Sequence, residues 1–220
     1  MPVTYEQIKN DERINTYIRQ ADESMRAMGF TEHSFAHVTK CAQTASGLLT
    51  DLGYSQREAE LARIAGHLHD IGNVVNRNDH AHSGALMAFR LLDELGMPAE
   101  DVAVVVTAIG NHDEHTAFPV NAVAAALILA DKSDVRRSRV RNREGIRSDI
   151  HDRVNYAVER ADLTLDRAAK TLTLTMTIDT TICPVMEYFE IFTTRMLLCR
   201  KAAQFFGLEF KLRINDAVIL

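Results

Sequence analysis

A change of hydrophobic period, late in the chain, most constrains how this sequence can fold. Apolar residues recur with helical spacing over residues 4–137, where glycines and capping residues separate amphipathic segments. Residues 171–178 instead alternate strictly between threonine and an apolar residue, which is the pattern of a strand with one buried face. The sequence therefore predicts a helical part followed by a smaller part that combines strands and helix.

Capping signals set the expected helix boundaries in the first part. Ser55 and Glu58 have the spacing of a capping box, and Asn121 is a favourable N-cap residue. Pro98 suits the first position of a helix, whereas Gly53 is a favourable terminator. The expected helices are residues 4–28, 31–52, 55–72, 79–96, 98–112 and 121–137. We expect a mainly α fold, a bundle of about five to seven helices.

The C-terminal part is expected to form a small α+β unit. Residues 162–166 and 171–178 predict a hairpin, residues 184–206 a long helix, and residues 208–214 a third strand. We divide the chain into a helical domain, 1–149, and a C-terminal extension, 150–220. A unit this small is marginal alone, so it should pack on the helical domain, on a second copy, or on both. A homodimer is the expected assembly.

Charge and composition exclude several classes of protein. The 220 residues include 25 Lys and Arg against 30 Asp and Glu, a net charge of −5, which argues against nucleic acid or an anionic membrane as partner. No apolar run approaches the roughly 20 residues of a membrane span, and no secretory signal precedes the first helix. Three cysteines are too few for a disulfide framework. We expect a cytoplasmic protein.

Polar residues interrupt the apolar stripes of four expected helices. His37, the His69-Asp70 pair, His112 and Asp131 each continue a stripe that should face the bundle interior. Burying such groups without partners costs roughly 2–7 kcal/mol for a neutral group and more for a carboxylate. A shared cation would offset that cost, so the pattern predicts a metal site between the helices.

The same residues resemble a known family. The sequence Leu68-His-Asp-Ile-Gly72 follows His37 and precedes Asp131, with His69 32 residues after the first and Asp70 61 residues before the second. This arrangement resembles the HD-domain superfamily of metal-dependent phosphohydrolases over residues 30–140. The resemblance implies a helical fold and an ion held by His37, His69, Asp70 and Asp131.

The first histidine of the motif has an alternative. His37-Val-Thr-Lys40-Cys41 resembles the family's His-x-x-Arg-Val element, with Lys and Cys as substitutions. His33 lies one helical turn earlier on the same face and is an alternative ligand.

Further residues resemble the branch of the family that holds two ions. By this likeness His80 and His112 hold a second ion, and Asp70 bridges the pair. Asp113 stands where the cyclic-dinucleotide branch has another histidine, and no Gly-Tyr-Pro follows, which argues against that substrate. Asp113 is an oxygen ligand or a water-orienting base in this interpretation. Asn73 replaces a lysine common in the family.

Mixed imidazole and carboxylate ligands favour one or two divalent transition-metal ions: Fe, Mn, Co or Zn, with Mg and Ni as further candidates. The expected reaction is attack of metal-bound hydroxide on phosphorus, for which Asp70, Asp113 and Lys132 are the expected catalytic residues. Basic residues crowd positions 132–143, directly after Asp131, and Lys132 and Arg136 are the expected substrate-binding cations.

The sequence thus predicts a phosphohydrolase that acts on a nucleotide or another small phosphorylated metabolite. Two alternatives remain open. One is a non-catalytic regulatory protein of the HD type that binds metal and nucleotide, and the other is an HD-type di-iron oxygenase. The C-terminal unit is expected to serve dimerisation or to close the mouth of the substrate site.

Overall fold

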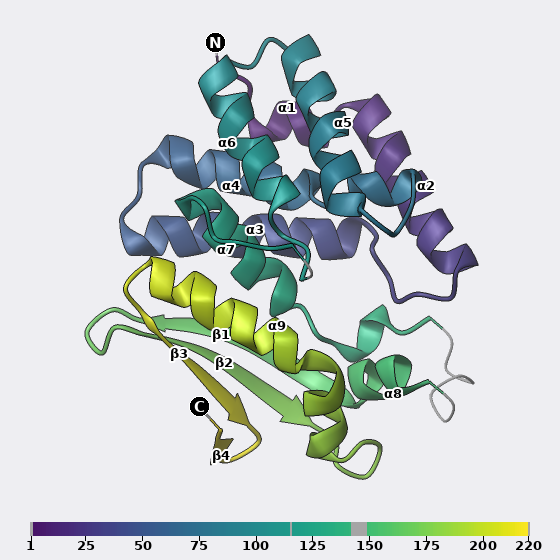
Figure 1. Ribbon diagram of the computed structural model, residues 1–220, viewed down its shortest axis with the longest axis vertical. Coiled ribbons are helices and arrows are strands. Elements are labelled where there is room, and N and C mark those ends of the chain that lie inside the picture. Colours follow the sequence, from purple (N-terminus) through teal and green to yellow (C-terminus); the bar gives the residue numbers. More distant parts are fainter. Residues whose placement is uncertain (1, 115, 142–148, 220) are drawn as a thin grey trace.

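The computed structural model describes residues 2–114, 116–141 and 149–219. A bundle of helices occupies one end of the molecule, and a sheet with one long helix occupies the other (Figure 1). This confirms the mainly α fold with a small C-terminal α+β unit. The bundle contains α1 (Tyr5–Lys9), α2 (Glu12–Ala27), α3 (Phe35–Leu52), α4 (Gln56–Leu68), α5 (His80–Glu94), α6 (Ala99–Gly110) and α7 (Ala122–Lys132), with the short 3-10 helices η1 (Ile71–Val74) and η2 (Arg137–Arg139).

Local capping explains most of these boundaries. The capping box of Ser55 and Glu58 is present at the start of α4, and the side chain of Asn121 accepts a hydrogen bond from the backbone N–H of Ala124. Gly53 ends α3 with a φ of 84°, a left-handed conformation that glycine adopts at little cost. Four of the six expected helices therefore end within a few residues of the predicted positions.

The first expected helix is in fact two helices. Residues 4–28 were predicted as one segment, but α1 ends at Lys9 and α2 begins at Glu12. The side chain of Asp11 accepts hydrogen bonds from the backbone N–H groups of Arg13 and Ile14, which makes it an N-cap inside the segment. The prediction of a continuous helix was wrong because Asp11 lies among other charged residues, so the sequence alone did not identify it as an N-cap.

Helix α7 ends at Lys132 rather than at Arg137. The hydroxyl of Ser133 donates to the carbonyl oxygen of Ala130, and the chain is extended at Arg136, with a φ of −162°. The residues after Asp131 therefore leave the helix axis, and the spacing expected of a continuing helix does not apply to them.

Two glycines allow a close approach of the helical segments that carry the predicted metal ligands. A Cβ on Gly66 of α4 would lie 2.7 Å from the backbone of Ala42 on α3, so these helices cross almost in backbone contact. A Cβ on Gly72 would lie 2.0 Å from the carbonyl oxygen of His80, so η1 packs directly on the start of α5. Larger residues would separate the segments that carry His37, His69, Asp70 and His80.

The C-terminal unit begins with a helix that the sequence did not predict. Helix α8 (Ile150–Ala157) is capped by Asp149 and continues without a turn into β1 (Val158–Asp166). Strands β2 (Thr171–Ile178), β3 (Glu209–Ile214) and β4 (Ala217–Val218) complete a sheet in the order β1-β2-β3-β4. The sheet therefore has four strands in the described chain, not three. Strands β2 and β3 are parallel, and α9 (Val185–Phe205) supplies the crossover that parallel strands need.

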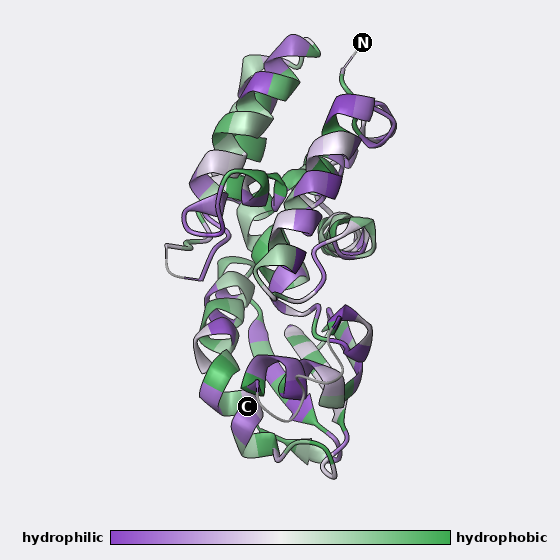
Figure 2. Cartoon of the chain, turned by 90° about the vertical axis from the view of Figure 1, so that its right-hand side faces the viewer, coloured by the Kyte–Doolittle hydropathy of each residue, from purple (hydrophilic) through white to green (hydrophobic). Residues whose placement is uncertain are grey.

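Helix α9 lies between the sheet and the bundle (Figure 1). Tyr188, Phe192, Met196 and Cys199 are buried along it, and it contacts both α7 and β3. Buried residues of the two parts belong to a single hydrophobic cluster. The C-terminal unit thus packs on the helical part, which was one of the predicted arrangements. Hydrophilic and hydrophobic residues share most helices, as expected of amphipathic elements around a common core (Figure 2).

Across the described residues, every helix is too short or too polar to cross a membrane.

Candidate metal centre

Side chains from five helical segments converge at one end of the bundle. Each lies near the start or the end of a helix or directly after one, so the ends of several helices meet at this point. Five of the six are buried, and the sixth, Asp131, has a side chain that is 12% exposed. The residues are His37 on α3, His69 and Asp70 after α4, His80 at the start of α5, His112 after α6 and Asp131 on α7.

Asp70 lies between two pairs of histidines. Its Oδ2 is 3.5 Å from Nε2 of His37 and 3.2 Å from Nε2 of His69. Its Oδ1 is 3.5 Å from Nε2 of His80 and 4.0 Å from Nε2 of His112. Each oxygen of this carboxylate therefore faces a different pair of imidazole nitrogens, which is the arrangement of a bridging ligand.

Asp131 faces only the first of these pairs. Its Oδ1 lies 3.3 Å from Nε2 of His37 and 3.8 Å from Nε2 of His69. The first group therefore has two imidazoles and two carboxylates, and the second has two imidazoles and the other oxygen of Asp70.

Three of the histidines are oriented by the same local hydrogen bond. Nδ1 of His69, His80 and His112 lies 2.9, 3.0 and 2.6 Å from the carbonyl oxygen three residues earlier in the chain. A carbonyl oxygen can only accept, so each Nδ1 carries the proton. Nε2 is then left with a lone pair that points into the centre, the tautomer that binds metal ions.

His37 is oriented by a residue that sequence reasoning missed. Its Nδ1 lies 2.8 Å from Oδ2 of Asp134, a fully buried carboxylate. Carboxylates in this position fix the ring of a metal-binding histidine and raise its basicity. The available signal was the position of Asp134, three residues after Asp131.

Asn73 performs a similar task for the central carboxylate. Its Nδ2 donates to Oδ1 of Asp70 at 3.0 Å and to the backbone carbonyl of the same residue. The sequence analysis noted Asn73 only as a departure from the family pattern. The structure shows that this amide holds Asp70 in the orientation that faces both histidine pairs.

Both central carboxylates are ionised. Burial alone would raise the pKa of Asp70, but His69, His33 and His37 hold that pKa well below its usual range. Burial also opposes ionisation of Asp131, but Lys132 and His37 hold the pKa of this carboxyl well below its usual range. The centre therefore carries fixed negative charge between its histidines.

The second histidine pair brings two Nε2 atoms close together, and Nη1 of Arg77 lies 3.4 Å from the one on His80. Nε2 of His80 and Nε2 of His112 are only 3.2 Å apart. Burial lowers the pKa of His112 to about 3 and also lowers the pKa of His80, which favours the neutral form of both rings. Nε2 of His69 is buried as well and has no hydrogen-bond partner in the described chain. Lone pairs that face one another in this way fit a bound cation.

The donor atoms fall into two overlapping groups with metal-like spacing. His37, Cys41, His69 and Asp131 form one, and His69, Asp70 and His112 form the other, each with its donor atoms within 4.8 Å of one another. Cys41 was not among the predicted ligands; its Sγ lies 3.7 Å from both ring nitrogens of His37. A nitrogen and oxygen donor set fits a divalent metal ion.

Comparison with known proteins agrees with this geometry. The family model described as HD domain matches residues 34–154, more than half of the chain. The chain belongs to the HD domain family. No curated protein matches it. The structure brings together His37, His69, Asp70 and Asp131, the four residues that the sequence analysis assigned to the HD motif by resemblance.

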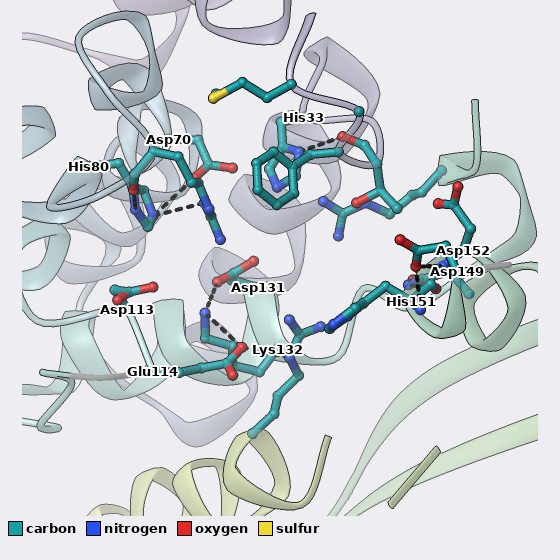
Figure 3. A pocket seen from close by; sticks show the side chains of 18 residues that line it. His33, Asp70, His80, Asp113, Glu114, Asp131, Lys132, Asp149, His151 and Asp152 are labelled. Atoms are coloured by element: carbon teal, nitrogen blue, oxygen red, sulfur yellow. Dashed lines mark hydrogen bonds and ion pairs between the residues drawn. The ribbon is translucent and has the colours of Figure 1, made fainter. Parts of the chain in front are cut away.

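His33, the alternative to His37, is outside both donor groups of this HD domain. Its Nδ1 donates to the carbonyl oxygen of Thr31 at 2.7 Å, and its ring lies at the pocket wall (Figure 3). The structure thus places His37 among the clustered donor atoms and His33 in the lining of the pocket.

A pocket of about 310 Å³ opens onto the HD residues (Figure 3). Asp70, His80 and Asp131 lie at one end of it, and Asp149 and Asp152 of the C-terminal unit lie at the other. Asp113 also lines the pocket, and Lys132 and His80 overcome the effect of burial and lower the pKa of its carboxyl. The C-terminal unit therefore forms part of the wall of the HD site.

A chain of charges connects the C-terminal unit to the HD residues. Nζ of Lys132 is 2.7 Å from Oδ2 of Asp131 and 3.7 Å from Oε1 of Glu114. Nε of Arg195, on α9, donates to the same oxygen of Glu114 at 2.8 Å. Sequence reasoning found Lys132 but missed Glu114 and Arg195, because the contact depends on how α9 packs against α7.

Arg136, one of the two predicted substrate-binding cations, already contacts two carboxylates. It pairs with Asp134 at 2.9 Å and with Glu32 at 3.3 Å, and it is absent from the pocket lining. The helix that was expected to carry it toward the pocket ends at Lys132. Arg139 lies in the lining instead, and residue 143, the last of the basic stretch 132–143, falls outside the described residues.

Proposed function

We propose that the protein is a metal-dependent phosphohydrolase that acts on a phosphate ester, a nucleotide or another small phosphorylated metabolite. One observation carries the proposal: the two oxygens of Asp70 face separate histidine pairs, and the Nε2 atoms of all four histidines converge on this carboxylate. Fe, Mn, Co or Zn best fits these donors. His37, His69, Asp70 and Asp131 would hold one ion, and His80 and His112 would hold a second, with Asp70 shared.

Such ions, when bound, acidify a water molecule and neutralise charge on the phosphoryl oxygens. The protein contributes fixed geometry. Hydrogen bonds from the Nδ1 atoms of His69, His80 and His112 to backbone carbonyls hold the rings in place before substrate arrives. Ligands that need no reorientation lower the cost of reaching the transition state.

Asp113 is suited to orient the attacking water and accept its proton. The carboxylate lines the pocket close to the second histidine pair, and its lowered pKa keeps it ionised at neutral pH. A general base must combine an available lone pair with a position in hydrogen-bond reach of the reacting water. Asp113 replaces the histidine of the cyclic-dinucleotide branch, which favours a different substrate here.

Lys132 is suited to balance the negative charge of the phosphoryl group. Its ammonium is buried at the pocket wall between Asp131 and Glu114, and Arg195 holds Glu114 from the opposite side. Arg195 therefore acts on the reaction only by positioning this carboxylate and, through it, Lys132. A cation fixed in this way stabilises charge in the transition state without having to reorganise.

The test is a phosphatase screen of protein loaded with Mn, Fe, Co, Ni, Zn or Mg, together with elemental analysis of the purified chain. We expect one or two transition-metal ions per chain and release of inorganic phosphate. Asp113→Asn should lower kcat by roughly a hundredfold with unchanged metal content. Asp93→Asn, the same change on the exposed face of α5, is the matched control.

Two results would contradict the proposal, in whole or in part. One is metal binding at the HD residues with no phosphate released from any ester, in any of these metals. The other is full activity of Asp113→Asn, which would contradict the role of Asp113 alone and leave the hydrolase assignment standing.

A further inference from the structure

Arg77 occupies a loop that is fixed beside the second histidine pair. The residue lies between η1 and α5, and its backbone carbonyl accepts the hydrogen bond from Nδ1 of His80. Its side chain is half-buried. It lines both the main pocket and the neighbouring pocket that Asp113 also borders. The guanidinium is therefore held at the junction of the two pockets.

The other cations of the main pocket already contact carboxylates. Each is committed to a pair within the protein, so each can balance only part of the charge of an incoming anion. The pairs are Lys132 with Asp131 at 2.7 Å, Arg195 with Glu114 at 2.8 Å, and Arg139 with Asp134 at 3.9 Å.

Arg77 differs, because its contacts in the described chain are with neutral groups. Its Nη1 lies 3.4 Å from Oδ1 of Asn73 and 3.4 Å from Nε2 of His80, both long for hydrogen bonds. The centre of its guanidinium group is 5.9 Å from the ring of Phe30. In the described part of the chain, no carboxylate forms an ion pair with it. The charge of Arg77 also contributes to the lowered pKa of Asp113, which lines the same two pockets, but the two side chains form no ion pair. A half-buried cation that is not paired with a carboxylate and faces a pocket fits an anionic ligand.

We propose that Arg77 binds the phosphate group of the substrate, in the role that the sequence had predicted for Arg136. The inference rests on the proposed function, because the ligand is the phosphoryl group that the ions would activate. Nη1 already lies beside Nε2 of His80, so a phosphoryl oxygen at the second ion is within reach of the guanidinium. The planar fork of arginine can then donate two hydrogen bonds to one phosphate.

Calorimetric binding of inorganic phosphate to the metal-loaded protein tests the proposal without requiring turnover. Arg77→Gln should weaken phosphate binding by roughly ten- to a hundredfold, the effect of losing a charge-assisted hydrogen bond. Arg77→Lys keeps the charge but loses the fork, so it should give an intermediate value. Arg90→Gln, on the exposed face of α5, is the matched control, and elemental analysis follows the ions in every variant.

The outcomes separate this proposal from the function on which it rests. If Arg77→Gln keeps its ions and binds phosphate within about threefold of the wild type, the assignment of Arg77 is overturned. Loss of an ion from Arg77→Gln also overturns it, because Arg77 would then serve the ion site. A larger loss in Arg136→Gln would restore the sequence-based prediction. Normal phosphate binding that depends on Arg77, without hydrolysis of any ester, would overturn the proposed function alone. A wild-type protein that binds no phosphate overturns both.

Discussion

The helical part and the C-terminal unit have opposite kinds of interior. Around His37, His69 and Asp70 the helices bury imidazoles and carboxylates next to the hydrophobic core. The C-terminal unit buries Leu174, Leu212 and similar side chains between its sheet and α9, and its buried carboxylate, Asp152, lines the pocket instead. The second interior is stable by apolar burial alone. The first contains groups whose burial is costly without a partner.

This difference indicates that the helical part, and not the C-terminal unit, contains the groups that reduce stability when no ion is bound. Buried polar groups persist in proteins when they are paired, but here Nε2 of His112 faces Nε2 of His80, and Nε2 of His69 has no hydrogen-bond partner in the described chain. An ion that binds only the folded chain stabilises it by mass action. The helical part should therefore respond to metal, and the sheet should respond to ordinary changes of packing.

The largest effect is expected at Asp70. Asp70→Ala removes the carboxylate that faces both histidine pairs, so the variant should lose both ions and lower the rate of ester hydrolysis by roughly a thousandfold or more. Elemental analysis and a phosphate-release assay measure the two quantities. Normal metal content in Asp70→Ala would show that the polar interior of the helical part does not serve to bind ions through Asp70.

The sheet should show the opposite response. Leu174 on β2 is fully buried, and Leu174→Ala should lower the free energy of unfolding by about 2–5 kcal/mol through the cavity it leaves. The number of ions per folded chain should not change. Thr177→Ala, at an exposed position of the same strand, is the control in denaturant unfolding. Loss of metal from folded Leu174→Ala would mean that packing in the sheet and metal binding in the helical part are coupled.

A smaller effect is expected at His67, a buried histidine that no donor group includes. Both of its ring nitrogens lack hydrogen-bond partners, and its ring packs against Tyr5 and Phe35. Burial lowers its pKa to about 4. As pH falls below about 6.5, His67 binds a proton in the unfolded chain but not in the folded chain. The free energy of unfolding therefore decreases until pH reaches about 4.

His67→Phe should remove this contribution, up to roughly 3 kcal/mol, and flatten the dependence of stability on pH between these limits. Unfolding at a series of pH values, with His82→Phe as the exposed control, measures it. An unchanged profile would mean that water or a neighbour satisfies His67 in solution. In that case, the buried polar groups of the helical part would reduce its stability only at the proposed ion sites.

The donors could be predicted because helical periodicity places them on apolar stripes. His37, His112 and Asp131 each continue such a stripe, and the adjacent His69 and Asp70 belong to a recognisable motif. What positions them could not be predicted in the same way. Asp134 orients His37 only because α7 ends early, and a local sequence pattern did not reveal that end.

Features that depend on packing were also missed. Helix α8 has eight residues, too few for a clear hydrophobic period, and it passes directly into a strand. Arg195 lies on a helix that was predicted correctly, but its contact with Glu114 exists only after α9 docks on the bundle. Arg136 was placed by extending a helix beyond its true end. Each of these depends on contacts between distant segments, which hydrophobic period does not encode.

The position of Arg195 on α9 has a consequence for how the protein matures. All of the proposed ligands lie before residue 132, so they leave the ribosome well ahead of the strand pair and the helix that follows it. The nascent helices can gather around an ion while the side that α9 will cover is still open to solvent. The last seventy or so residues are synthesised later, and the C-terminal unit then completes the wall of the pocket after the ion can have bound.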